Sequence, residues 1–100
     1  MSTDMINVKL RTILNFKKII GKGEVDFPVE DGTILEAALD KMVEIYGKEL
    51  ESNLFHPDNG SLLQHIRLMV NGRDIAFLDG LQTILQDGDE ILILPPVAGG

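Results

Sequence analysis

The sequence predicts an α+β fold in which a mixed sheet of about four to five strands packs on one main helix. Two segments near the N-terminus alternate between apolar and polar residues, as half-buried strands do. One long helical pattern follows, and further strand patterns close the chain. No repeat or linker divides the sequence. We therefore expect one folded domain over residues 1–94 and a flexible tail over residues 95–100.

The first two strands are expected at residues 6–13 and 23–29, joined by a polar turn at residues 15–22. Pro28 has no N–H to donate to a ladder, so it indicates that the second strand lies at an edge or ends there. The apolar faces of the two strands comprise Ile6, Val8 and Leu10, and Val25, Phe27 and Val29.

The main helix is predicted within "DGTILEAALDKMVEIYGK". Thr33 and Glu36 have the spacing of a capping box, in which each side chain bonds the free backbone N–H of the other residue. Gly47 supplies the stop signal. The apolar stripe that should face the sheet comprises Leu35, Ala38, Leu39, Met42 and Tyr46.

The sequence predicts a long connection over residues 48–64 that can contain one short helical turn. A strand with Ile66, Leu68 and Val70 on one face then runs into Asn71-Gly72. This dipeptide is a strong signal for a tight hairpin, because both turn positions favour positive φ. "DGDE" at residues 87–90 is the turn before the last strand, "EILILPP".

The last strand is apolar on both faces, because Ile91, Leu92, Ile93 and Leu94 follow one another. With one helix available, one face of this strand should remain partly exposed, and such a patch usually marks an interaction surface. The alternative is that the connection at residues 48–64 covers it.

The composition excludes several classes of function. The formal charge of −7 argues against nucleic acid, whose phosphates need basic residues. No apolar run approaches the length needed to span a bilayer and no signal peptide is evident, so we expect a cytoplasmic protein without a membrane partner. The absence of cysteine excludes disulfides, zinc–thiolate sites and cysteine nucleophiles.

The sequence motifs do not assemble an active site. His56 and His65 have no ligand-spaced acids beside them, so no metal site is expected. "DGDE" lacks the alternating ligands and distal Glu of an EF-hand. "GKG" lacks the third glycine of a dinucleotide-binding loop. We expect no independent enzyme.

The C-terminus "PPVAGG" has features of a working segment. Pro95 and Pro96 cannot continue a sheet and fix φ, so they end the strand. Val97, Ala98, Gly99 and Gly100 then decrease in size to no side chain at all. Such an end can thread a narrow channel and present its carboxylate to another protein. A thiocarboxylate there would let a chain without cysteine carry sulfur.

The stretch "NGRDI…FLDGLQTILQDGDEILILPPVAGG", in this order of elements, resembles the ubiquitin-like β-grasp sulfur carriers. It looks most like the small subunit of molybdopterin synthase (the MoaD family), and the resemblance is strongest over residues 70–100. The thiamine-pathway carriers (the ThiS family) share the fold and the Gly-Gly end but are usually shorter. The long connection at residues 48–64 resembles an archaeal-type branch that includes protein modifiers.

The resemblance implies that this chain is not an enzyme by itself but the sulfur-carrying subunit of molybdopterin synthase, with no cofactor of its own. An E1-like adenylyltransferase (MoeB-like) would use ATP to adenylate the carboxylate of Gly100, and a sulfur donor protein would supply the thiocarboxylate sulfur. The tail, Pro95, Pro96, Val97, Ala98 and Gly99, would insert into the large subunit (MoaE-like), with Gly99 needed for clearance. There the sulfur would pass to a pterin precursor of the molybdenum or tungsten cofactor.

By analogy with ubiquitin, Ile91 and Ile93 should face the helix, while Leu92 and Leu94 face partners. Phe77 is a further candidate for that interface. Other functions stay open: a ubiquitin-like modifier joined to lysines through Gly100, a sulfur carrier for thiamine or cysteine synthesis, or an interaction module with an incidental tail.

Overall fold

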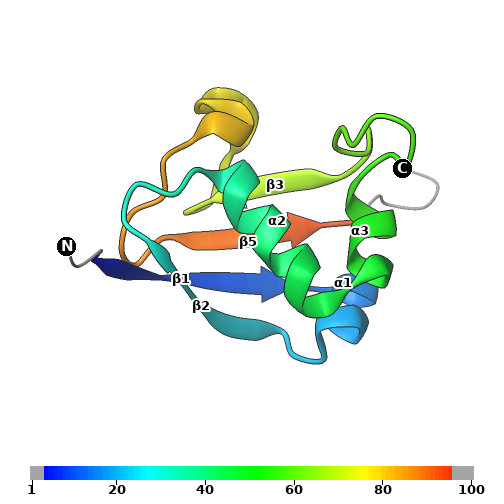
Figure 1. Ribbon diagram of the computed structural model, residues 1–100, viewed down its shortest axis with the longest axis horizontal. Helices are drawn as coiled ribbons and strands as arrows, with labels where there is room; N and C mark the ends of the chain where they lie inside the picture. The colour runs from blue at the N-terminus through cyan, green and yellow to red at the C-terminus, as the bar shows by residue number, and fades with distance from the viewer. Residues whose placement is uncertain (1–3, 96–100) are drawn as a thin grey trace.

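The computed structural model describes residues 4–95, which form a five-stranded mixed sheet with helices packed on one face (Figure 1). The strand order is β2-β1-β5-β3-β4, in which β1 and β5 run parallel and the other neighbouring pairs run antiparallel. The strands are β1 (Met5–Thr12), β2 (Glu24–Glu30), β3 (Arg67–Val70), β4 (Arg73–Asp74) and β5 (Glu90–Leu94). The predicted α+β class is confirmed.

The first hairpin follows the predicted alternation. Val8 and Leu10 of β1 and Phe27 and Val29 of β2 are buried. β2 pairs with β1 alone, so Pro28 lies in an edge strand, as its missing N–H requires.

The predicted polar turn between these strands contains a helix, α1 (Leu14–Ile20). Phe16 explains why the segment folds back onto the core, because its side chain is fully buried. Gly21, with φ of 90°, ends the helix in a left-handed conformation that suits glycine.

The main helix, α2 (Leu35–Tyr46), buries the predicted stripe except for Tyr46, which is half-buried. The predicted capping box is wrong. Thr33 Oγ1 donates instead to the Glu30 carbonyl at 2.6 Å. The N–H of Leu35 donates to the carbonyl of Thr83 at 2.8 Å. A backbone group from a distant segment therefore satisfies a free donor at the start of the helix.

The connection after α2 is more ordered than the sequence suggests. Gly47 ends α2 as predicted, and α3 (Lys48–Leu54) begins directly after it. α3 buries Leu50 and Leu54, and Phe55 then pairs with Leu62 across a short loop. The described chain therefore has three α-helices rather than one, and α2 contacts α3 on the side of the core.

The Asn71-Gly72 turn is confirmed. Asn71 and Gly72 have φ of 53° and 81° and join β3 to the short β4. The Asn71 side chain also accepts from the N–H of Glu90 at 2.9 Å and donates to Asp89 at 2.9 Å. Two short 3₁₀ helices, η1 (Ile75–Phe77) and η2 (Gly80–Gln82), lead from β4 toward β5. The hairpin turn is thereby tied to the start of the last strand.

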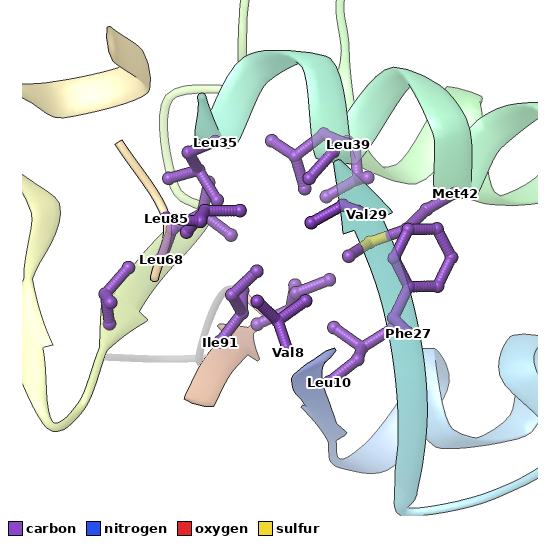
Figure 2. Close-up of a cluster of buried hydrophobic side chains, with 14 of the residues drawn as sticks. Val8, Leu10, Phe27, Val29, Leu35, Leu39, Met42, Leu68, Leu85 and Ile91 are labelled. Carbon is purple, nitrogen blue, oxygen red and sulfur yellow. The ribbon is translucent and has the colours of Figure 1, made fainter. Parts of the chain in front are cut away.

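The core lies between the sheet and α2 (Figure 2). Side chains from β1, β2, β3 and β5 meet Leu35, Leu39 and Met42 of α2 there. No helix within residues 4–95 has the length and apolar character needed to cross a membrane.

We expect Leu39→Ala to lower the free energy of unfolding by about 2–5 kcal/mol, because it leaves a cavity in a fully buried site. Ile45→Ala on the same helix is the matched control. Its side chain is 61% exposed, and we expect a change within about 0.5 kcal/mol. Urea unfolding of both variants measures the difference. Equal effects would contradict the assignment of the buried face of α2.

Candidate functional site

The last strand, β5, occupies the centre of the sheet, with β1 on one side and β3 on the other. Ile91 and Ile93 point to the helices and are fully buried. Leu92 and Leu94 alternate to the opposite face of the sheet, where both are half-buried. The expected orientation of the four residues is therefore confirmed. β5 is thus held on both edges up to the point where the chain leaves the sheet.

The connection at residues 48–64 does not cover the opposite face. Leu50 and Leu54 of α3 join the same core as α2, on the helical side of the sheet (Figure 1). This settles the two alternatives for the last strand: its second face stays partly exposed among the described residues.

Neighbouring strands extend the apolar surface around β5. Met69 of β3 pairs directly with Leu92. Thr12 of β1 pairs with Ile93, so Ile13 continues the extended chain beside Leu94. Strand alternation puts Ile13 on the outward face, and its side chain is 41% exposed. We call Ile13, Met69, Leu92 and Leu94 the outward patch.

Leu14 lies next to the outward patch and is unusual in its backbone. Its φ is 53°, a left-handed conformation that is energetically unfavourable for leucine. The side chain is 68% exposed. Sequence reasoning did not identify Ile13 or Leu14 as site residues. The sequence did contain a signal for Ile13: strand alternation puts it on the same face as Lys9 and Arg11, which is the face opposite the core.

Paired charges surround the outward patch. Arg11, which lies beside Leu92, contacts Glu90 at 3.4 Å and Glu24 at 3.5 Å. Arg67, which pairs with Leu94, contacts Asp74 at 3.7 Å. Exposed pairs of this kind contribute little to stability, so a partner's charges can replace them at low cost. An apolar centre with a polar rim is the arrangement of a protein–protein interface.

Phe77 lies apart from this surface. It belongs to η1, beyond the edge strand β4, and β3 and β4 separate it from β5 in the sheet. Its side chain is 82% exposed. The structure therefore does not bring Phe77 together with Leu92 and Leu94.

Among the predicted tail residues, Pro95 is described and is buried. Pro96, Val97, Ala98, Gly99 and Gly100 lie outside the described residues. Within residues 4–95, no group of three or more His, Cys, Asp or Glu side chains is placed to hold a metal ion. The acids of the "DGDE" turn accept backbone hydrogen bonds instead: Asp87 from Asn7 and Asp89 from Gln86, each at 2.8 Å.

The β1–β2 hairpin, the crossing helix α2 and the central parallel strand β5 define a ubiquitin-like β-grasp protein. The crystal structure of SAMP1 from Haloferax volcanii matches with a TM-score of 0.80 and 30% identity, covering 94% of this chain and 99% of that one.

The chain belongs to the ThiS family, whose model matches residues 7–100. Small archaeal modifier protein 3 of Haloferax volcanii is 30% identical over 95 residues, which is 95% of this chain and 100% of that protein. A putative sulfur carrier protein of Archaeoglobus fulgidus is 36% identical over 81 residues, covering 81% and 89% of the two chains. These similarities support the carrier and modifier class rather than molybdopterin synthase in particular.

Proposed function

We propose that this chain is a ubiquitin-like sulfur carrier whose reactive group is the C-terminal carboxylate of Gly100. The observation that carries the proposal is the extent of the family match, which continues through the Gly-Gly end to residue 100. The position of β5 supports it, because a strand held on both edges gives the following residues a fixed starting point.

The chemistry needs no side chain of this protein. A carboxylate oxygen of Gly100 attacks the α-phosphorus of ATP on an E1-like enzyme, and pyrophosphate leaves. A persulfide on a donor protein then attacks the acyl carbon and displaces AMP, which gives an acyl disulfide. A second thiol reduces the sulfur–sulfur bond of this intermediate and releases the thiocarboxylate. The absence of side chains at Gly99 and Gly100 lets the backbone enter a narrow channel.

The acceptor in this proposal is a pterin precursor held by the large subunit of molybdopterin synthase, in the cytoplasm. Nucleophilic attack by the thiocarboxylate sulfur joins the carrier to the pterin as a thioester. Water hydrolyses the thioester, which leaves the sulfur on the pterin and regenerates the Gly100 carboxylate. Two such transfers supply the two sulfurs of the dithiolene that binds molybdenum or tungsten. The outward patch docks the partner proteins, with Leu92, Leu94 and Ile13 at its centre and Phe77 as a separate candidate contact. Docking at this face puts the residues after Pro95 beside the partner's active site.

The second candidate is a ubiquitin-like modifier, in which a lysine amine attacks the same acyl-adenylate and forms an amide. Similarity to small archaeal modifier protein 3 over 95% of this chain favours it. The two functions share the activation step, and one chain can serve both.

Deletion of Gly99 and Gly100 in the native host tests the proposal. We expect loss of the pterin cofactor if the chain serves molybdopterin synthase, and loss of high-mass conjugates on blots if it is a modifier. Ile45→Ala is the control, because it leaves the tail and the outward patch intact. If cofactor and conjugates both persist in cells that contain the deleted protein at normal levels, both candidates are wrong, which leaves a sulfur carrier for thiamine or cysteine synthesis or an interaction module.

A further inference from the structure

A groove lies at the end of the sheet where β5 finishes. Its volume is about 300 Å³, at the lower limit of small-molecule pockets. Three segments line it: the start of α1, the end of α3 with His56 just after it, and the chain that leads into β3. Figure 1 shows these segments gathered at the end toward which the β5 arrow points. We call this pocket the β5-end groove; its lining includes Asn15, Ser52, Asn53, Gln64, His65 and Ile66.

The strand register connects this groove to the end of β5. Leu94 pairs with Arg67, so continuing the register puts Pro95 beside Ile66, which lines the groove. On the other side, Thr12 pairs with Ile93, which puts Pro95 beside Leu14, next to Asn15. The buried Pro95 therefore lies between two of the lining segments.

The charge of the β5-end groove sets it apart. The chain has 16 acidic residues against 9 basic ones, yet no Asp or Glu lines this groove. Two other grooves have acidic linings, with Glu36, Asp40 and Glu51 in one and Glu30, Asp40 and Glu44 in the other. Of these three grooves, only the β5-end groove has no negatively charged side chain in its lining to repel a carboxylate.

The lining also offers hydrogen-bond donors. Asn15 Nδ2 donates one N–H to Asn53 Oδ1 at 3.3 Å, which leaves its second N–H for a ligand. The Gln64 amide and the imidazole of His65 are exposed at the groove and supply further N–H groups. These N–H groups are hydrogen-bond donors of the kind that bind a carboxylate.

We propose that the β5-end groove binds the C-terminal residues of this same chain, Gly99 and Gly100, when no partner is present. The occupant is close enough, because the five residues after Pro95 span at most about 17 Å when extended. It is small enough for the groove, because its last two residues have no side chains. It carries the terminal carboxylate, for which the acid-free lining is suited.

The binding itself does not depend on any activity, but its regulatory meaning rests on the proposed function. A bound end competes with insertion into a partner enzyme. If the groove holds the end for about nine-tenths of the time, the apparent affinity of such a partner falls about tenfold. Partner docking on the outward patch would then accompany release of the end from the groove.

The test is ¹⁵N relaxation and NOE spectroscopy of the full-length protein, alone in solution. We expect order parameters above about 0.6 for Gly99 and Gly100, and NOEs from their α-protons to the side chains of Gln64 and His65. Gln64→Glu adds a carboxylate to the groove and should lower both order parameters below about 0.6. Gln82→Glu makes the same change at an exposed position on η2, at the other end of the sheet, and should leave them as in the wild type.

Low order parameters in the wild-type protein, or equal responses to the two Glu variants, would overturn the proposal. The experiment contains no ATP and no enzyme. A free end therefore leaves the sulfur-carrier proposal intact, and a failure of sulfur transfer leaves this binding result intact.

Discussion

Gly100→Leu is expected to abolish thiocarboxylate formation while leaving the fold intact. The reactive carbon must enter an active site on another protein, and a leucine side chain on the terminal residue blocks a channel that fits bare backbone. The described fold ends with Pro95 buried beside β5, so no core side chain changes. We expect the melting temperature to shift by no more than about 4 °C, the effect of a surface substitution on a domain of this size.

Mass spectrometry after incubation with the E1-like enzyme, ATP and a sulfur donor measures this effect, and calorimetry measures the melt. Gly100→Ala is the graded control, because a single methyl group should reduce the yield less than leucine does. A normal yield of thiocarboxylate from Gly100→Leu would contradict the proposed role of the glycine end. A large loss of stability would show that the end is a structural element.

Ile13→Asp is expected to raise the Kd for the activating enzyme at least about tenfold, which corresponds to about 1.4 kcal/mol. Ile13 lies beside Leu94 on the outward patch, and a carboxylate there must be desolvated when an apolar partner surface closes over it. The side chain is already 41% exposed in the free protein, so the fold should tolerate the change.

Ile84→Asp is the matched control. Ile84 is also an exposed isoleucine, at 60%, but it pairs with Ile34 ahead of α2, away from β5. We expect its Kd to stay within about twofold of the wild type, as for a contact outside the interface. Isothermal titration gives both constants. Similar losses of affinity for the activating enzyme in the two variants would mean that added negative charge, rather than the outward patch, governs binding.

The long, regular patterns of the sequence predicted most of the fold. The alternation in β1 and β2, the apolar stripe of α2 and the Asn71-Gly72 turn are local signals that tertiary contacts reinforce. The sequence did not predict α1 as a helix, and it predicted α3 only as one short helical turn within residues 48–64. Each has seven residues, too few to show a helical period, and each is stabilised by one or two buried side chains such as Phe16 and Leu50.

The start of α2 shows a different limit of prediction from local sequence. Thr33 and Glu36 have the right spacing for a capping box, but the loop after η2 brings the Thr83 carbonyl to the N–H of Leu35. A local sequence rule cannot anticipate a partner 48 residues away in the chain, and here the long-range contact prevails.

The sequence likewise predicted only those parts of the candidate site that depend on a local pattern. The two faces of β5 followed from alternation within one strand, so Leu92 and Leu94 were identified correctly as outward-facing. Ile13 and Met69 join them only through pairing with neighbouring strands. The β5-end groove needs three segments far apart in sequence, and no local pattern in the sequence predicted it.

The most direct test of the central claim is the intact mass of the wild-type protein after incubation with the E1-like enzyme, ATP and a sulfur donor. The proposed function predicts a mass increase equal to the exchange of one oxygen for one sulfur, with fragmentation assigning it to Gly100. It also predicts no such change when ATP is omitted. An unchanged mass under conditions in which the enzyme is active on a known carrier would contradict the claim that the C-terminal carboxylate is the reactive group.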